Sequence, residues 1–174
     1  MYKKFRNLEI IGFFVVSALA VGFHFIYDAT QSPILAAIAP ANESIWEHIK
    51  MIFFPYFIWA IVEMLILKPS DKSAFWKAKS YGLLSLPLML IVFFYTYSGI
   101  LGYSLTAIDI ASTFVYIAIA FIISYRAYKY SWDRFSNIVA VLAIVFGIML
   151  IVFTYATPRV ALFKDAISGN YGIV

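Results

Sequence analysis

The sequence predicts an all-α polytopic membrane protein, in which residues 1–174 form a single bundle of about five transmembrane helices. Hydrophobic residues make up 64% of the chain and charged residues 13%, whereas soluble proteins average about 45–50% and about 25%. Five segments contain the roughly 20 apolar residues that a helix needs to cross the hydrocarbon core of a bilayer. Aromatic residues reach 20%, which suits a protein with Tyr and Trp at both membrane interfaces.

The hydrophobic runs define where the spans lie. The predicted spans are residues 8–28, 43–67, 79–98, 104–125 and 136–155. Pro55 and Pro87 fall inside the second and third spans, where neighbouring helices can satisfy the freed carbonyl groups, so we expect kinks and not breaks. The basic start of the chain also fits a signal peptide. Because the apolar run continues past Ala20, we expect a retained membrane anchor.

The basic residues predict the orientation. Of the thirteen Lys and Arg residues, all but Lys50, Arg159 and Lys164 fall on the side that carries the N-terminus. The positive-inside rule therefore predicts a multi-pass protein of the cell membrane with its N-terminus in the cytoplasm and its C-terminus outside. Since the basic residues serve as the topology signal, we expect membrane lipid as a partner and no nucleic acid. Cysteine is absent, which excludes disulfides, thiolate metal sites and cysteine nucleophiles.

Polar side chains gather near the outer ends of the predicted spans. Both histidines of the chain, His24 and His48, lie at this level. Polar groups inside a membrane are costly and mark candidate functional sites. The other members of this layer are Asp28, Glu43, Glu47, Asp109, Tyr27, Tyr95 and Tyr97.

The block from Asn42 to Lys50 is the densest part of this layer and has two interpretations. In the first, Asn42 caps an interfacial helix, and the acidic residues of the first turn interact favourably with the helix dipole. Glu43, Trp46 and Glu47 would then share a face with Lys50. In the second interpretation, the same side chains belong to a polar site.

In the second interpretation, the polar site would bind a divalent metal ion such as Zn²⁺. His24, His48 and Glu47 would bind the ion and leave one coordination position open. Glu43 would act as the acid partner, and Asp28, four residues after His24, would orient its ring. The same groups could also transfer protons without a metal. Two histidines that share an ion must lie within about 6 Å of each other, because each bond is about 2.1 Å long.

A haem held between His24 and His48 is the less favoured cofactor. Ligation by two histidines requires room for the ring. Gly22 leaves space near His24, but Trp46 and Glu47 crowd His48.

Asp109 lies about two turns into the fourth predicted span and is a further catalytic candidate. It could form a helix–helix hydrogen bond to Tyr or Ser, or act as a proton or cation relay. Glu9 and Glu63 lie near the cytoplasmic side, where Lys or Arg can pair with them, and we interpret both as structural.

The tail, residues 157–174, is too short and polar for a sixth span and too apolar for a disordered segment. We expect it to fold over the outer mouth of the bundle as a cap, with Lys164 or Arg159 facing the acidic residues. The groups expected to surround the site are Tyr27, Trp46, Tyr95, Lys164 and Asp165.

The sequence N-E-S-I-W-E-H-I-K from Asn42 to Lys50 resembles a block found in small prokaryotic membrane proteins of unknown function. Those proteins carry a similar N-E-S-x-W-E-H segment after a first helix that bears a histidine. The likeness extends to residues 94–102 and to the tail around Lys164 and Tyr171. The resemblance implies no reaction, but it implies that Glu43, Trp46, Glu47 and His48 form a site and not only a cap.

Three functions remain open at this stage. The leading hypothesis is a membrane-embedded, metal-assisted hydrolase that acts on a lipid or other amphipathic substrate. The second is a proton- or cation-coupled transporter or solute-binding protein that uses Asp109; five spans lack the usual inverted repeats, so this function would require a homo-oligomer. The third is a non-catalytic membrane partner subunit.

Overall fold

The computed structural model describes residues 2–173 and contains five long α-helices. They are α1 (Tyr2–Thr30), α2 (Ile45–Leu67), α3 (Lys72–Leu101), α4 (Thr106–Lys129) and α5 (Ser136–Tyr155). Two short 3₁₀ turns, η1 (Leu35–Ala37) and η2 (Ala161–Phe163), follow α1 and α5. Within residues 2–173 there is no strand, and one isolated bridge pairs Lys164 with Tyr171. Met1 and Val174, the ends of the predicted domain and cap, lie outside the described residues.

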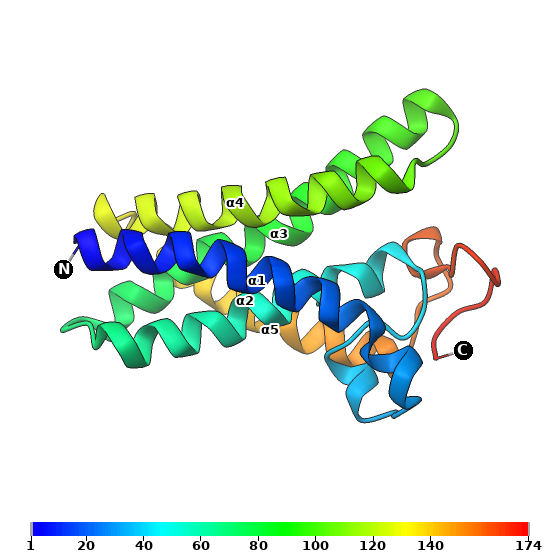
Figure 1. The fold of residues 1–174 in the computed structure, drawn as a ribbon, viewed down its shortest axis with the longest axis horizontal. Helices are drawn as coiled ribbons and strands as arrows, with labels where there is room; N and C mark the ends of the chain where they lie inside the picture. The colour runs from blue at the N-terminus through cyan, green and yellow to red at the C-terminus, as the bar shows by residue number, and fades with distance from the viewer. Residues whose placement is uncertain (1, 174) are drawn as a thin grey trace.

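All five helices are long and apolar enough to cross a membrane, which confirms the predicted all-helical architecture and indicates a membrane protein. Their outer faces are apolar: on α5, Ile138, Ile144 and Ile148 are all more than half exposed. Figure 1 shows the two termini at opposite ends of the bundle. We call these the amino-terminal end, which also carries the α2–α3 and α4–α5 connections, and the carboxy-terminal end.

Side-chain caps fix where α2 and α3 begin, and a glycine fixes where α3 ends. The Ser44 hydroxyl accepts a hydrogen bond from the Glu47 N–H and starts α2, and the Asp71 carboxylate does the same for the Ala74 N–H at the start of α3. Gly102 has φ +80° and ends α3, its N–H donating to the Ser98 carbonyl. An αL residue after the last turn is a frequent helix stop.

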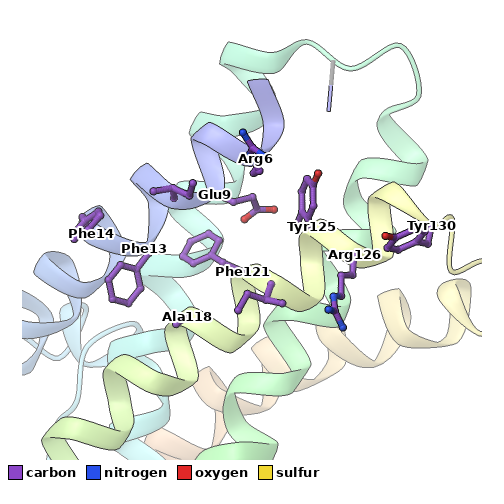
Figure 2. A pocket seen from close by; sticks show the side chains of 11 residues that line it. Arg6, Glu9, Phe13, Phe14, Ala118, Phe121, Tyr125, Arg126 and Tyr130 are labelled. Carbon is purple, nitrogen blue, oxygen red and sulfur yellow. The ribbon is translucent and has the colours of Figure 1, made fainter. Parts of the chain in front are cut away.

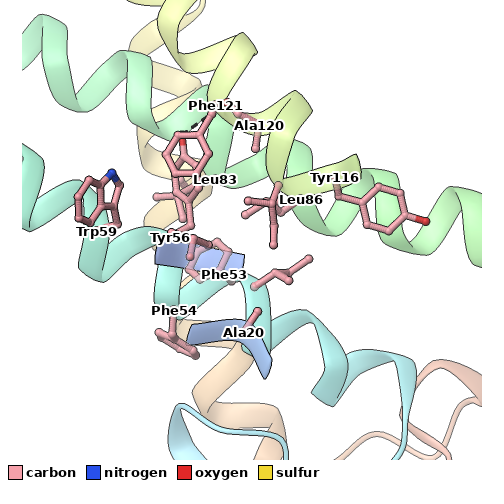
Figure 3. Packing of buried hydrophobic residues seen from close by; sticks show 14 of the residues in the cluster. Ala20, Phe53, Phe54, Tyr56, Trp59, Leu83, Leu86, Tyr116, Ala120 and Phe121 are labelled. Atoms are coloured by element: carbon pink, nitrogen blue, oxygen red, sulfur yellow. Dashed lines mark hydrogen bonds between the residues drawn. The ribbon is translucent and has the colours of Figure 1, made fainter. Parts of the chain in front are cut away.

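Glycines bring the helices close together in the core. A Cβ added at Gly82 of α3 would lie 2.2 Å from the Tyr56 hydroxyl, and one added at Gly12 of α1 would lie 2.2 Å from Trp59 Nε1. Both aromatic residues belong to α2 and are buried; Figure 3 shows them beside Phe121 of α4. Small residues at such contacts are typical of membrane helix packing, where close approach of the backbones stabilises the bundle.

The carboxy-terminal end of the bundle carries the α1–α2 connection, the α3–α4 hairpin and the segment after α5. The α1–α2 connection and the segment after α5 lie next to each other, and the α3–α4 hairpin projects away from them at the same end (Figure 1). Tyr155 donates a hydrogen bond to the Pro33 carbonyl, and η1 packs against both α1 and α5. This arrangement positions the loop before α2, where the candidate site lies.

Candidate metal centre

His24, Glu43 and His48 form a compact group at the carboxy-terminal end. His24 belongs to the last two turns of α1, His48 to the first turn of α2, and Glu43 to the loop between them. One potential ligand atom from each residue lies within 4.8 Å of the other two. The Glu43 carboxylate bridges the histidines, 3.3 Å from His48 Nε2 and 3.9 Å from His24 Nε2. The two ring centroids are 5.5 Å apart, inside the limit set for a shared ion.

Glu43 reaches this position because α2 begins later than we predicted. The predicted cap is Asn42, with Glu43 in the first turn, but Ser44 is the cap and Ile45 the first helical residue. The Asn42 side chain instead accepts from the Ser44 N–H (2.8 Å) and donates to the Gly172 carbonyl (2.7 Å). The sequence carried a signal for this, since S-I-W-E (Ser44–Glu47) has the spacing of a capping box.

A backbone contact fixes which His48 nitrogen faces Glu43. His48 Nδ1 lies 2.9 Å from the Ser44 carbonyl oxygen, which can only accept, so Nδ1 carries a proton. In the neutral ring, Nε2 then presents a lone pair to the carboxylate 3.3 Å away. Two acceptors at this distance repel unless a cation lies between them. A proton on His48 Nε2 or a metal ion would remove this repulsion. Metal-binding histidines are usually oriented by a hydrogen bond from their other ring nitrogen, as His48 is here by the Ser44 carbonyl.

The charge at Glu43 is maintained by its surroundings. When the histidines are protonated, the hydrogen bond with His48 lowers the pKa of Glu43 below its usual 4.5, and the positive charges of His48 and His24 act in the same direction, whereas partial burial and Asp165 oppose them. The side chains of all three residues of the triad are about one-third exposed. A partly exposed, negatively charged carboxylate beside two imidazoles is a suitable ligand set for a cation.

The segment after α5 supports the loop that carries Glu43. Asp165 is buried, and its carboxylate accepts hydrogen bonds from the N–H groups of Glu43 (3.1 Å), Ile167 (3.2 Å) and Ser168 (3.0 Å). Burial alone would raise the pKa of Asp165, but these bonds and the Ser168 hydroxyl lower it below 3.8. Lys164 is exposed and contributes its backbone to the bridge with Tyr171.

Glu47, which we expected to be a metal ligand, lies in a different cluster. Its carboxylate accepts from the Ala41 N–H (2.8 Å) and the Lys50 ammonium (2.7 Å). Lys50 also donates to the Ala36 carbonyl (2.7 Å) and contacts the Thr154 hydroxyl. Both charged side chains are almost fully buried. Helical geometry turns Glu47 away from His48 and towards η1 and α5, so it joins these elements instead of the triad.

The other expected site residues are spread around the same end. Asp28 is exposed, and among the described residues it forms no ion pair with His24, whose ring turns towards Glu43. Trp46 is buried against Phe163, with ring centroids 4.7 Å apart. The Asp109 carboxylate accepts from the Tyr97 hydroxyl. Tyr27 is buried near η1, and Tyr95 is largely exposed on α3.

The triad has the composition of a catalytic metal centre. Two imidazoles and one carboxylate are a common ligand set of catalytic zinc, which keeps the fourth position for water or substrate. Glu43 Oε2 lies 3.3 Å from His48 Nε2, and Oε1 lies 3.9 Å from His24 Nε2. Atoms bonded at about 2.1 Å to one tetrahedral ion would lie roughly 3.4 Å apart, so the three ligand atoms, now within 4.8 Å of one another, would move slightly closer around an ion. The sequence predicted that Glu47 lies beside the two histidines, whereas the structure places Glu43 there, because α2 begins at Ile45 and not before Glu43.

Comparison with known proteins gives a family and no activity. No curated protein and no solved structure matches the chain. The profile of one family, described as a family of unknown function (DUF6512), matches residues 1–173. The chain, with its five apolar helices and its triad of His24, Glu43 and His48, belongs to the DUF6512 family.

Proposed function

We propose that the protein is a membrane-embedded metalloenzyme that binds a divalent metal such as Zn²⁺ through His24, Glu43 and His48 and hydrolyses a lipid or other amphipathic substrate. The observation that supports it is the triad itself, in which three potential ligand atoms lie within 4.8 Å of one another. Two features add to this: the Ser44 carbonyl orients His48, and the Asp165 carboxylate holds the backbone of Glu43.

The depth of the triad favours an amphipathic substrate. His24 is six residues before the end of α1 and His48 is the fourth residue of α2, so both lie within about 10 Å of a helix end at 1.5 Å per residue. Polar headgroups and the bonds next to them occupy this level of a bilayer. In the cell membrane, with the N-terminus in the cytoplasm as the distribution of basic residues favours, the triad would face the outer leaflet.

The chemistry would start from a water molecule on the open metal position. Zn²⁺ held by His24, Glu43 and His48 would lower the pKa of a bound water to about 7 and would so supply hydroxide at neutral pH. The triad supplies one negative charge and two neutral ligands, so a bound divalent ion keeps a net positive charge that can polarise the carbonyl or phosphoryl oxygen of a substrate.

Metal analysis of the purified full-length protein tests the binding step. Protein prepared without chelators should contain about one equivalent of zinc, and His48→Ala or Glu43→Gln should lose it. Asp28→Asn is the matched control, because Asp28 is an acidic residue of the same region outside the triad. Substoichiometric metal in the wild type, or equal loss in Asp28→Asn, would contradict the assignment.

Turnover is tested separately on the zinc-loaded protein in mixed micelles with ester and phosphoester substrates. We expect hydrolysis that stops with chelator, returns with added zinc and is absent in Glu43→Gln. Stoichiometric zinc without turnover of any substrate in the panel would contradict the hydrolase and leave the metal site standing.

A further inference from the structure

A second cluster of charged residues lies at the opposite, amino-terminal end, inside the helix bundle. It contains Glu9 of α1, Glu63 of α2 and Lys79 of α3, which are 4%, 0% and 0% exposed. The Lys79 ammonium lies 3.0 Å from Glu9 Oε2 and also contacts Glu63 Oε2. Ser124 of α4 donates a hydrogen bond to Glu9 Oε1 (2.9 Å). Four helices thus converge on these side chains.

The charges of this cluster do not balance if every group is ionised. Two carboxylates face one ammonium, and an uncompensated buried charge is strongly unfavourable. Lysine is the member whose charge is best supported, because its Nζ lies 5.2–5.7 Å from the centroids of four aromatic rings, at cation–π distance. The excess charge is therefore negative, and it belongs to the two glutamates.

The two glutamates of the cluster differ in the number of their polar partners. Glu63 is completely buried; its Oε2 is paired with the Lys79 ammonium, and its Oε1 has no hydrogen-bond partner within the described part of the chain. Glu9, in contrast, accepts bonds from both Lys79 and Ser124. Hydrogen bonds to the charged form stabilise that form. The excess proton therefore belongs to this pair of carboxylates, which share the Lys79 ammonium.

Within residues 2–173, no charged group outside the cluster forms an ion pair with its members. Tyr56 of α2 faces it with a buried hydroxyl, and α5 has no charged residue in its sequence. Arg6 and Arg126 are exposed, and neither forms an ion pair with Glu9 within residues 2–173. The remaining titratable neighbours, from α4, are Tyr125 and Tyr128.

A cavity connects the cluster to the surface. It has a volume of about 490 Å³, lies between α1 and α4, and is lined by Glu9, Arg6, Phe121, Tyr125 and Arg126 among others. Figure 2 shows the Glu9 side chain pointing into the space between these two helices. Glu63 does not line the cavity. Glu9, although only 4% exposed, is thus the carboxylate that borders the cavity, and Glu63 is the one that does not.

From this geometry we propose that Glu9, Lys79 and Glu63 form a proton-binding site that holds one proton at neutral pH and exchanges it through the cavity at Glu9. The proton enters at the Glu9 carboxylate. Lys79, which contacts both glutamates, then releases one proton to Glu63 and recovers one from Glu9, so the total charge is unchanged by the transfer. A proton fits better than a metal cation, because the Lys79 ammonium already occupies the place between the carboxylates.

Infrared spectroscopy of the full-length protein in lipid nanodiscs tests the proton count. At pH 7 the wild type should show the C=O stretch of one protonated carboxyl group. Glu9→Gln and Glu63→Gln should each lose this band, because the single remaining carboxylate balances Lys79. Lys79→Gln should roughly double it, since both glutamates would then be neutral. Asp109→Asn is the control for the acid near the other end and should leave the band unchanged.

Absence of this band in the wild type, or its persistence in both Glu9→Gln and Glu63→Gln, would overturn the proposal. If Lys79→Gln does not fold, the loss or persistence of the band in Glu9→Gln and Glu63→Gln decides whether the proposal holds. Loss of the wild-type band on adding sodium at constant pH would also overturn it, in favour of a cation site.

The exchange path is tested by transfer into D₂O. Ala118 lines the cavity away from the charged groups, so Ala118→Trp should fill the cavity, keep the band and slow its isotope shift at least tenfold. An unchanged exchange rate with the band intact would exclude the cavity as the path.

Discussion

At the scale of single residues, Glu43 and Glu47 show how position decides the role of a carboxylate. They are four residues apart, on either side of the point where α2 begins at Ile45. Glu43 remains outside the helix and bridges two histidines. Glu47 lies inside the first turn, where it pairs with Lys50 and accepts from the Ala41 N–H. Glu43 is partly exposed and suited to bind a cation. Glu47 is buried and connects α2 to the loop before it and to α5.

Glu47→Gln should therefore affect stability and not metal binding. Removing one partner of a buried ion pair leaves the other charge uncompensated and typically costs about 3–5 kcal/mol. We expect a clearly lower midpoint of thermal unfolding than in Glu43→Gln, with zinc content per folded molecule unchanged. If Glu47→Gln lost zinc at unaltered stability, Glu47 would be the ligand, as the sequence analysis first assumed.

Asp165 should make stability depend on pH in the acidic range. Its pKa in the folded protein is lowered below 3.8, so its contribution is complete above about pH 4 and is lost as pH falls through the folded value. Thermal unfolding of the metal-free wild type between pH 2 and pH 6 should show this loss, and Asp165→Asn should reduce it. A variant with the same acid dependence as the wild type would show that Asp165 is not responsible.

The residue types of the candidate site could be predicted from the sequence, but their grouping could not. A polar layer at the ends of apolar helices is visible from spacing alone, and it includes both histidines. Whether Glu43 or Glu47 faces them depends on the residue at which α2 starts. Both Asn42 and Ser44 are suitable caps by residue type. In the structure Ser44 caps α2, and the Asn42 side chain bonds to the Gly172 carbonyl, 130 residues away in sequence, a contact that local sequence patterns do not predict.

At the scale of elements, close contacts between helices impose a steric limit that can be tested. Gly82→Ala would place a Cβ 2.2 Å from the Tyr56 hydroxyl and 2.8 Å from the Ala120 carbonyl oxygen, so α3 would have to shift. Overpacking of this kind costs about 1–3 kcal/mol. Gly22→Ala is the matched control, because nothing lies within 4 Å of its added Cβ. Equal unfolding midpoints for the two variants would contradict the packing.

The centres of the helices were predictable, and their ends were less so. The prediction for α5 matched its bounds, Ser136–Tyr155. In contrast, α1 and α3 begin at Tyr2 and Lys72 instead of residues 8 and 79. Hydropathy detects only the part of a helix in hydrocarbon, about 30 Å, whereas the bilayer with its headgroups is about 40–45 Å thick. A helix of 29 residues such as α1 is about 43 Å long and fits the full thickness.

At the scale of the whole molecule, two polar clusters lie at opposite ends of one apolar bundle. The sequence analysis expected basic partners for Glu9 and Glu63, but it could not show that both share Lys79. That arrangement depends on three helices meeting at one point, and no pattern within a single segment encodes it. The proposed metal site and the proposed proton site are also independent, because no residue belongs to both.

The proposed orientation can be tested with single cysteines, since the chain has none. Ile167→Cys, at a side chain that is 83% exposed, should react with a membrane-impermeant maleimide on intact cells. Ser70→Cys, in the exposed α2–α3 connection, should react only after permeabilisation. The reverse pattern would place the triad on the cytoplasmic side.

The most direct test of the metal centre is X-ray absorption at the zinc edge of the zinc-loaded, full-length protein. The triad predicts a first shell of nitrogen and oxygen at about 2.0–2.1 Å, with the outer-shell scattering of two imidazole rings. His24→Ala should reduce this to one ring or lose the metal. A spectrum without imidazole scattering, or one unchanged in His24→Ala, would show that zinc binds elsewhere and that His24, Glu43 and His48 are not its ligands.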